Sequence, residues 1–207
     1  MRQAISNKNV TRAQFDVADF RGDWLRLIGR PELRGSWIVF GSSGSGKTTF
    51  ALQLAKYLAG FGKVAYNSLE QGLSLSFQLG WDRVRMEEAG SNIVLLEKES
   101  MDDLRYRLAR KRSPDIVIID SLTCLPGFGK RDYVSLVRDY SNKLFIFLSH
   151  IKNGIPDPAI AETVRRLSEV KILVQGFKAY ATSRYTSESG DYVIWPEGAE
   201  KFEIKNL

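Results

Sequence analysis

Eight consecutive residues have the types and spacing of a phosphate-binding loop. Residues 41 to 48 read Gly-Ser-Ser-Gly-Ser-Gly-Lys-Thr, which fits the P-loop pattern of two fixed glycines followed by Lys and a hydroxyl residue. In such a loop, glycine turns place successive backbone N–H groups around phosphate oxygens. Lys47 then reaches the β- and γ-phosphates, and the Thr48 hydroxyl ligates the Mg²⁺ that bridges them. The predicted nucleotide-binding residues are Gly41, Ser42, Ser43, Gly44, Ser45, Gly46, Lys47, Thr48 and Thr49.

Two carboxylates follow apolar segments that have the length of strands. Asp120 ends the run Ile-Val-Ile-Ile-Asp, and downstream of a P-loop such an acid holds Mg²⁺ opposite Thr48, usually through water. The alternative is a capping Asp on an ordinary core strand. Glu70 follows the segment 63 to 69, where a carboxylate orients or deprotonates the water that attacks the γ-phosphate. The alternative is a Glu at a helix start that interacts with the helix dipole.

The chain has one histidine, His150, which follows the apolar segment 143 to 149. An imidazole at a strand end can donate a hydrogen bond to the γ-phosphate and report its loss to the next loop. It can equally bond a neighbouring carbonyl. We predict a catalytic set of Glu70, Lys47 and His150 and a metal set of Thr48 and Asp120.

Alternating strands and helices position these residues. Apolar segments with the length of strands are expected at 35–41, 63–69, 92–96, 115–120 and 143–149, and helices between them at 49–59, 72–80, 101–111 and 131–140. This order predicts a parallel sheet buried on both faces, with functional groups at the carboxyl ends of its strands. A helix at 159–167 and strands at 170–174, 177–182 and 192–195 predict a terminal antiparallel β-meander. The expected fold class is therefore a three-layer α/β P-loop NTPase.

A helical N-terminal segment is expected to precede this core. Apolar residues at helical spacing predict one amphipathic helix over residues 11 to 28, with Thr11 as its N-cap. The domain prediction is an N-terminal helical segment at residues 1 to 30 and an ATPase core at residues 31 to 207.

Bulk properties narrow the classes of protein. The chain has 207 residues, 30 Lys plus Arg against 24 Asp plus Glu, and a formal net charge of +6, which is compatible with nucleic-acid binding without establishing it. The basic cluster at residues 105 to 112 is explained by a solvated helix face. There is no apolar run of about 20 residues and no secretion signal, so no membrane association and a cytoplasmic location are expected. One Cys and one His exclude an internal disulfide and, by themselves, a structural zinc site.

The ordered set of motifs resembles the RecA-like ATPases. It consists of the P-loop, Glu70 after Ser-Leu, the run Ile-Ile-Asp-Ser, a polar residue after Leu-Ser, and the meander. Ser-Leu-Glu is similar to DnaB-type helicases, and Ser-Glu-Val-Lys-Ile at 168 to 172 is similar to RadA. The resemblance covers about residues 33 to 202, and it is greatest to the small, core-only forms that phages and mobile elements carry.

The resemblance implies roles and partners. Glu70 would be the catalytic glutamate and Asp120 the Walker B acid, while His150 departs from the Gln that many members carry. Single-stranded DNA would contact the loops after Ser121 and His150 through Lys130, Arg131, Lys152 and Asn153. Lys178 and Arg184 would be trans fingers that reach the nucleotide of a neighbouring subunit. The implied ligands are ATP and Mg²⁺, and the implied assembly is a homo-oligomeric ring or filament, with residues 15 to 18 matching a Phe-x-x-Ala polymerisation segment.

Three functions remain open on the sequence. The preferred one is an ATPase that works as an oligomer on DNA in recombination, replication or repair. A nucleotide-dependent loader or switch that binds a replication partner is the second. A small-molecule P-loop kinase is the third, and it is disfavoured because such kinases usually end in helices with an Arg-rich lid, whereas this chain is predicted to end in strands.

Overall fold

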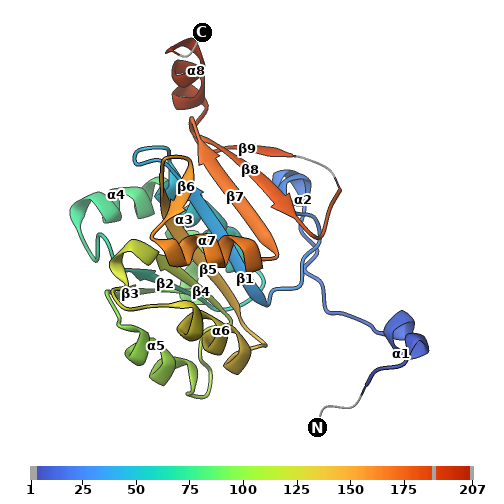
Figure 1. Ribbon diagram of the computed structural model, residues 1–207. Coiled ribbons are helices and arrows are strands. Elements are labelled where there is room, and N and C mark those ends of the chain that lie inside the picture. The colour runs from blue at the N-terminus through green and yellow to red at the C-terminus, as the bar shows by residue number, and fades with distance from the viewer. Residues whose placement is uncertain (1–3, 188–189, 206–207) are drawn as a thin grey trace.

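The computed structural model describes residues 4 to 187 and 190 to 205, and its centre is one mixed β-sheet (Figure 1). In this part of the chain the sheet has nine strands, in the order β3-β2-β4-β5-β1-β7-β8-β9, with β6 paired to β5. The strands are β1 (Gly35–Gly41), β2 (Val64–Ser68), β3 (Ile93–Glu97), β4 (Ile116–Asp120), β5 (Leu144–Lys152), β6 (Ile155–Asp157), β7 (Val170–Gln175), β8 (Lys178–Ser183) and β9 (Asp191–Val193).

The described part of the chain has eight α-helices, and those from α2 to α7 cover both faces of this sheet. They are α1 (Asn7–Arg12), α2 (Gly22–Ile28), α3 (Lys47–Leu58), α4 (Leu75–Arg83), α5 (Met101–Leu108), α6 (Lys130–Asp139), α7 (Ala159–Leu167) and α8 (Pro196–Lys205), with short 3₁₀ helices η1 (Met86–Asn92) and η2 (Leu122–Cys124). Side chains from α2, α3 and α4 pack on one face, and those from α5, α6 and α7 pack on the other. The three layers predicted from the sequence are confirmed.

Strand residues alternate between these two cores. In β5, Leu144, Ile146 and Leu148 join the first core, whereas Phe145 and Phe147 join the second. Such strands are apolar throughout because both of their faces are buried. Because of this continuous apolar character, these strands could be predicted from the sequence.

The terminal meander is also confirmed. Strand β7 runs parallel to β1, and β8 and β9 then add antiparallel pairs. The predicted strand at 192–195 ends earlier than expected, at Val193.

The single N-terminal helix predicted at residues 11 to 28 is wrong. Two short helices, α1 and α2, flank an extended stretch, and the N-cap of α1 is Ser6 rather than Thr11. Ala18 and Phe20 are buried on either side of an exposed Asp19, which is the two-residue period of an extended chain. Ala18 N–H donates to Pro31 O at 2.8 Å, so backbone bonding to the core replaces the helix. Figure 1 shows α1 standing away from the sheet.

The two ends of the Phe-x-x-Ala segment at residues 15 to 18 differ in their exposure to solvent. The ring of Phe15 is 59% exposed, whereas Ala18 belongs to the core of its own chain. In this conformation only the Phe end is available to another molecule.

Two elements near the strand ends were not predicted. The loop expected after His150 is a hairpin, because β5 continues to Lys152 and pairs with β6. Asn153 and Gly154 both have positive φ, as a two-residue type I′ turn requires. The chain also continues from the meander into α8, so the expectation that it ends in strands is wrong. Among the described residues, no helix combines the length and the apolar character needed to cross a bilayer.

Candidate active site

The P-loop connects β1 to α3 at the carboxyl end of the parallel strands. Gly44 and Gly46 have φ of 72° and 100°, which residues with a Cβ rarely adopt. A Cβ on Gly41 would collide with the carbonyl oxygen of Val174 on the neighbouring strand. The loop therefore needs glycine at these positions to keep its backbone open toward a ligand.

Unpaired polar groups of this loop fit a phosphate. The Ser45 hydroxyl is buried and has no hydrogen-bond partner among the described residues. Helix α3 starts with no side-chain cap, which leaves N–H donors at a helix N-terminus where anions bind. Since buried polar groups almost always find partners, the orphaned hydroxyl and the uncapped helix indicate an anionic ligand.

Lys47 lies within this loop and is 7% exposed. Its Nζ donates to Ser42 O at 2.8 Å, which directs the ammonium back along the loop. Burial lowers the pKa of Lys47, and the nearby carboxylates of Asp120 and Glu70 partly offset this. A buried cation in a phosphate-binding loop is suited to a triphosphate.

Asp120 is the buried acid of the site. It ends β4, is 6% exposed, and accepts a hydrogen bond from the Tyr66 hydroxyl at 2.6 Å through Oδ2. Burial raises the pKa of Asp120 to about 6, although the Tyr66 hydrogen bond and Lys47 act in the opposite direction. The described residues hold no cluster of three or more metal-ligating side chains. One carboxylate with the Thr48 hydroxyl still fits Mg²⁺, which binds few protein groups and completes its shell with phosphate and water.

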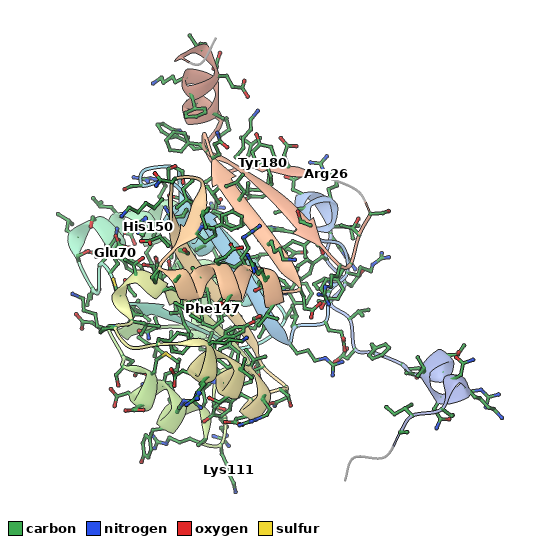
Figure 2. All side chains as sticks on the ribbon, in the orientation of Figure 1. Arg26, Glu70, Lys111, Phe147, His150 and Tyr180 are labelled. Atoms are coloured by element: carbon green, nitrogen blue, oxygen red, sulfur yellow. The ribbon has the colours of Figure 1, made fainter. Side chains whose placement is uncertain are left out.

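Glu70 is held by the end of β4. The N–H groups of Leu69 and Glu70 donate to Asp120 O at 2.7 and 3.1 Å, so the turn after β2 is attached directly beside the buried acid. Nε2 of His150 lies 3.1 Å from Oε2 of Glu70, and the Ser121 hydroxyl donates to the same oxygen at 3.4 Å. Figure 2 shows Glu70 and His150 side by side.

The predicted catalytic and metal residues therefore converge. Four strands of the sheet bring these residues to one end of it. Lys47 comes from the P-loop after β1, Glu70 from the turn after β2, Asp120 from β4 and His150 from β5. Tyr66 and Ser121 belong to the same cluster and were missed. The signal for Ser121 was its place directly after Asp120. The contact of Tyr66 depends on the pairing of β2 with β4, which the sequence alone does not give.

The four predicted DNA-binding residues are exposed. Lys130 and Arg131 begin α6, Lys152 ends β5, and Asn153 forms the hairpin turn. None of them has an ion pair within the described ranges. One surface cavity is lined both by the loop after β4, including Lys130, and by Pro158 and Ala159 after β6, so the loop after β4 adjoins the start of α7.

The two predicted trans fingers lie apart. Lys178 starts β8 and forms an ion pair with Glu203 of α8. Arg184 follows the other end of β8 and pairs with Glu169 at 3.2 Å. At about 3.3 Å per residue, the two lie roughly 20 Å apart. They do not form one cluster.

Comparison with known proteins identifies relatives in sequence. No protein-family model matches the chain. Over 144 residues it is 28% identical to the DNA repair protein RadA of Streptococcus pneumoniae, a match that covers 68% of this chain and 32% of that protein. RadA of Streptococcus pyogenes serotype M3 matches equally, over 30% of its length. The chain thus spans about a third of these relatives.

Solved structures of two other proteins share the fold. The flagellar accessory protein FlaH of Methanocaldococcus jannaschii superimposes with a TM-score of 0.61 at 15% identity, over 86% of this chain and 93% of that one. The ATPase domain of a second protein superimposes with a TM-score of 0.54 at 15% identity, over 82% of this chain and 84% of that domain. At these identities the likeness establishes the fold alone.

Proposed function

We propose that the chain is a RecA-like P-loop ATPase that binds ATP with Mg²⁺ and hydrolyses it, and its fold and its sequence similarity to RadA support this. We further propose that it works as an oligomer on DNA, in recombination, replication or repair. The observation that carries the proposal is the convergence of Glu70 and His150 on the buried pair of Lys47 and Asp120.

The proposed reaction assigns one task to each residue. P-loop N–H groups and Lys47 hold the β- and γ-phosphates, while Thr48 and Asp120 hold Mg²⁺, which neutralises charge on the phosphate oxygens. Glu70 orients a water for in-line attack and accepts its proton. His150 donates through Nε2 either to the Glu70 carboxylate, which it then positions, or to a γ-phosphate oxygen.

DNA binding rests on unpaired charge at the same end of the molecule. Lys130, Arg131 and Lys152 are exposed and have no ion pair among the described residues, and Asn153 directly follows Lys152. Cations of this kind attract the phosphates of a single strand, and the affinity falls steeply with salt. Their loops follow Asp120 and His150 directly, which would couple bound DNA to the hydrolytic residues.

The oligomeric part of the proposal rests on solvent exposure. The side chains of Glu70 and His150 are 47% and 28% exposed, so a γ-phosphate beside them would be open to a neighbouring subunit. Lys178 or Arg184 of that neighbour would act as the trans finger. Because these two residues lie far apart on β8, one nucleotide would use only one of them.

A loader or switch remains the second candidate. FlaH, a flagellar accessory protein, has this fold over nearly its whole chain, so the fold is compatible with a partner other than DNA. The kinase alternative loses one argument against it, because the chain ends in α8 rather than in strands. The Glu70 and His150 pair still favours water over a phosphate-accepting substrate.

ATP hydrolysis should be measured with and without single-stranded DNA, together with molar mass by light scattering. We expect DNA to stimulate hydrolysis and ATP to promote assembly. The double substitution Lys130→Ala/Arg131→Ala should weaken DNA binding about tenfold. Lys111→Ala/Arg112→Ala is the matched control, because Lys111 lies at the opposite end of the molecule from Glu70 (Figure 2).

The outcomes separate the three candidates. A strict monomer whose hydrolysis ignores DNA would contradict the DNA and oligomer proposal. Hydrolysis stimulated by a protein partner and not by DNA favours the loader, and transfer of phosphate to a small acceptor favours the kinase.

A further inference from the structure

Tyr66 of β2 lies next to the candidate metal residue Asp120. It pairs in register with Ile118 of β4, two residues before Asp120, so the side chains of Tyr66 and Asp120 share one face of the sheet. The Tyr66 hydroxyl donates to Oδ2 of Asp120 at 2.6 Å. Because Tyr66 is 0% exposed, its hydroxyl has no water to bond in place of this carboxylate.

The hydrogen bond makes the two oxygens of the Asp120 carboxylate inequivalent. Oδ2 is held by Tyr66, whereas Oδ1 accepts no hydrogen bond from the described residues. Three side-chain atoms of the described residues are buried without a partner, and Oδ1 is not among them, so it keeps contact with solvent. A carboxylate with one fixed and one open oxygen suits Mg²⁺, which keeps several waters and binds few protein groups.

The Tyr66 ring is itself held in place by α4. Phe77, the only buried side chain of that helix, packs on it with ring centroids 5.5 Å apart and an interplanar angle of 58°. In a close-packed core the ring cannot turn away from Asp120 without disrupting this contact. The sheet and the helix together therefore fix the hydroxyl that orients the acid.

We propose that Tyr66 is a positioning residue for the metal site, which holds Asp120 by Oδ2 and leaves Oδ1 for Mg²⁺ or one of its waters. The inference rests on the proposed Mg²⁺-ATP function and adds to it a residue outside the P-loop and the strand ends. Without the hydroxyl, Oδ2 loses its partner, and the carboxylate is no longer fixed in one orientation. Removing such a partner of a metal ligand typically lowers metal affinity by about 10- to 100-fold.

Tyr66→Phe removes the hydroxyl and keeps the ring. ATP dissociation constants should be measured by calorimetry on the full chain, over a range of Mg²⁺ concentrations and with Mg²⁺ removed by a chelator. We expect the Mg²⁺ concentration of half-maximal effect to rise about tenfold, while the affinity for metal-free ATP stays within about twofold. A merely structural loss would reduce the fraction of folded protein and would shift neither constant.

Tyr133→Phe is the matched control. Tyr133 is also a buried tyrosine, and its hydroxyl lies 2.6 Å from Ser36 Oγ, but it belongs to the second core and its loss should leave both constants unchanged. Asp120→Asn gives a second comparison. If Tyr66 acts through Asp120, adding Tyr66→Phe to Asp120→Asn should change the Mg²⁺ constant by less than about twofold.

The outcomes distinguish this inference from the proposed function. A wild-type Mg²⁺ constant in Tyr66→Phe would overturn the positioning role while leaving ATP binding intact. An undiminished effect of Tyr66→Phe in the Asp120→Asn protein, or an equal effect of Tyr133→Phe, would overturn it as well. Binding of ATP by the wild-type protein without any dependence on Mg²⁺ would overturn both proposals.

Discussion

The buried and exposed halves of the candidate site differ in how the chain holds them. Lys47 and Asp120 are 7% and 6% exposed, and contacts to Ser42 and Tyr66 fix them. The side chains of Glu70 and His150 are 47% and 28% exposed and are held mainly by each other and by Ser121. Under the proposed assignment, the residues for phosphate and metal are fixed by contacts within one chain, whereas the residues for hydrolysis lie where a second molecule can reach them.

Burying Lys47 and Asp120 costs free energy, which favours a functional role for this buried pair. Desolvation disfavours both charged groups, lowering the pKa of Lys47 and raising that of Asp120. A chain selected for stability alone would put neutral groups here. Perturbed ionisable groups at the end of a sheet are typical of binding and catalytic sites.

Removing the buried cation should give the largest effect. Lys47→Ala should weaken binding of Mg²⁺-ATP by at least about a hundredfold, because charge-assisted hydrogen bonds contribute about 1.5–3 kcal/mol each. Equilibrium binding measures this. Lys63→Ala is the matched control, since Lys63 is exposed and lies just before the amino end of β2. Tight ATP binding by Lys47→Ala would contradict the assignment of the whole loop.

Neutralising the buried acid should weaken function and increase stability. The pKa of Asp120 is about 6 in the folded protein, whereas its ordinary value is 3.8. Between these two pH values the folded protein keeps the Asp120 proton and the unfolded chain has released it. The wild-type free energy of unfolding should therefore fall as the pH rises from 4 to 6, by up to about 3 kcal/mol. Asp120→Asn lacks this loss and should be more stable by roughly that amount at pH 7, with little difference at pH 4.

Denaturant unfolding at the two pH values tests this, and Mg²⁺-dependent nucleotide binding should weaken by about tenfold or more in the same variant. The exposed acid provides the contrast, because Glu70→Gln should change stability by less than about 0.5 kcal/mol. Equal effects of the two substitutions on stability would remove the distinction between the halves.

The smallest expected effect is that of the exposed histidine. His150→Ala should lower the rate of ATP hydrolysis by about tenfold, because Glu70 loses one of its two side-chain hydrogen-bond partners. His150→Gln should recover most of the rate, since an amide also donates. ATP affinity should stay within about threefold in both variants. Equal losses in Ala and Gln would point to the imidazole itself rather than to its hydrogen bond.

The sequence predicted the core and the convergence of the site because both depend on local patterns. Strands buried on two faces are continuously apolar, as in β4 and β5, and polar residues at their ends must meet at one edge of a parallel sheet. The extended stretch before α2 was missed because Phe15 and Ala18 are three residues apart and Phe20 and Trp24 are four residues apart, which fits a helical spacing. Only the contacts of Ala18 and Phe20 with the core select the two-residue period.

The hairpin strand β6 and the helix α8 had sequence signals that were not used, whereas a cavity lined by Thr49 and Gln53 of α3 depends on tertiary packing. Asn153-Gly154 is a strong hairpin turn sequence, and Pro196 followed by Glu197 is a helix start, so β6 and α8 could have been predicted. The cavity next to Thr49 could not, because it combines α3, α4 and the meander. Its one sequence signal is that Thr49 and Gln53 are four residues apart and therefore lie on one face of α3.

The central claim is that Glu70 performs hydrolysis and leaves binding to the buried half. The most direct test is a single-turnover measurement of ATP hydrolysis by Glu70→Gln, with the ATP dissociation constant determined on the same preparation. We predict that the rate falls by about 10²–10⁴-fold while the dissociation constant stays within about threefold of the wild-type value. Hydrolysis at the wild-type rate would contradict the account.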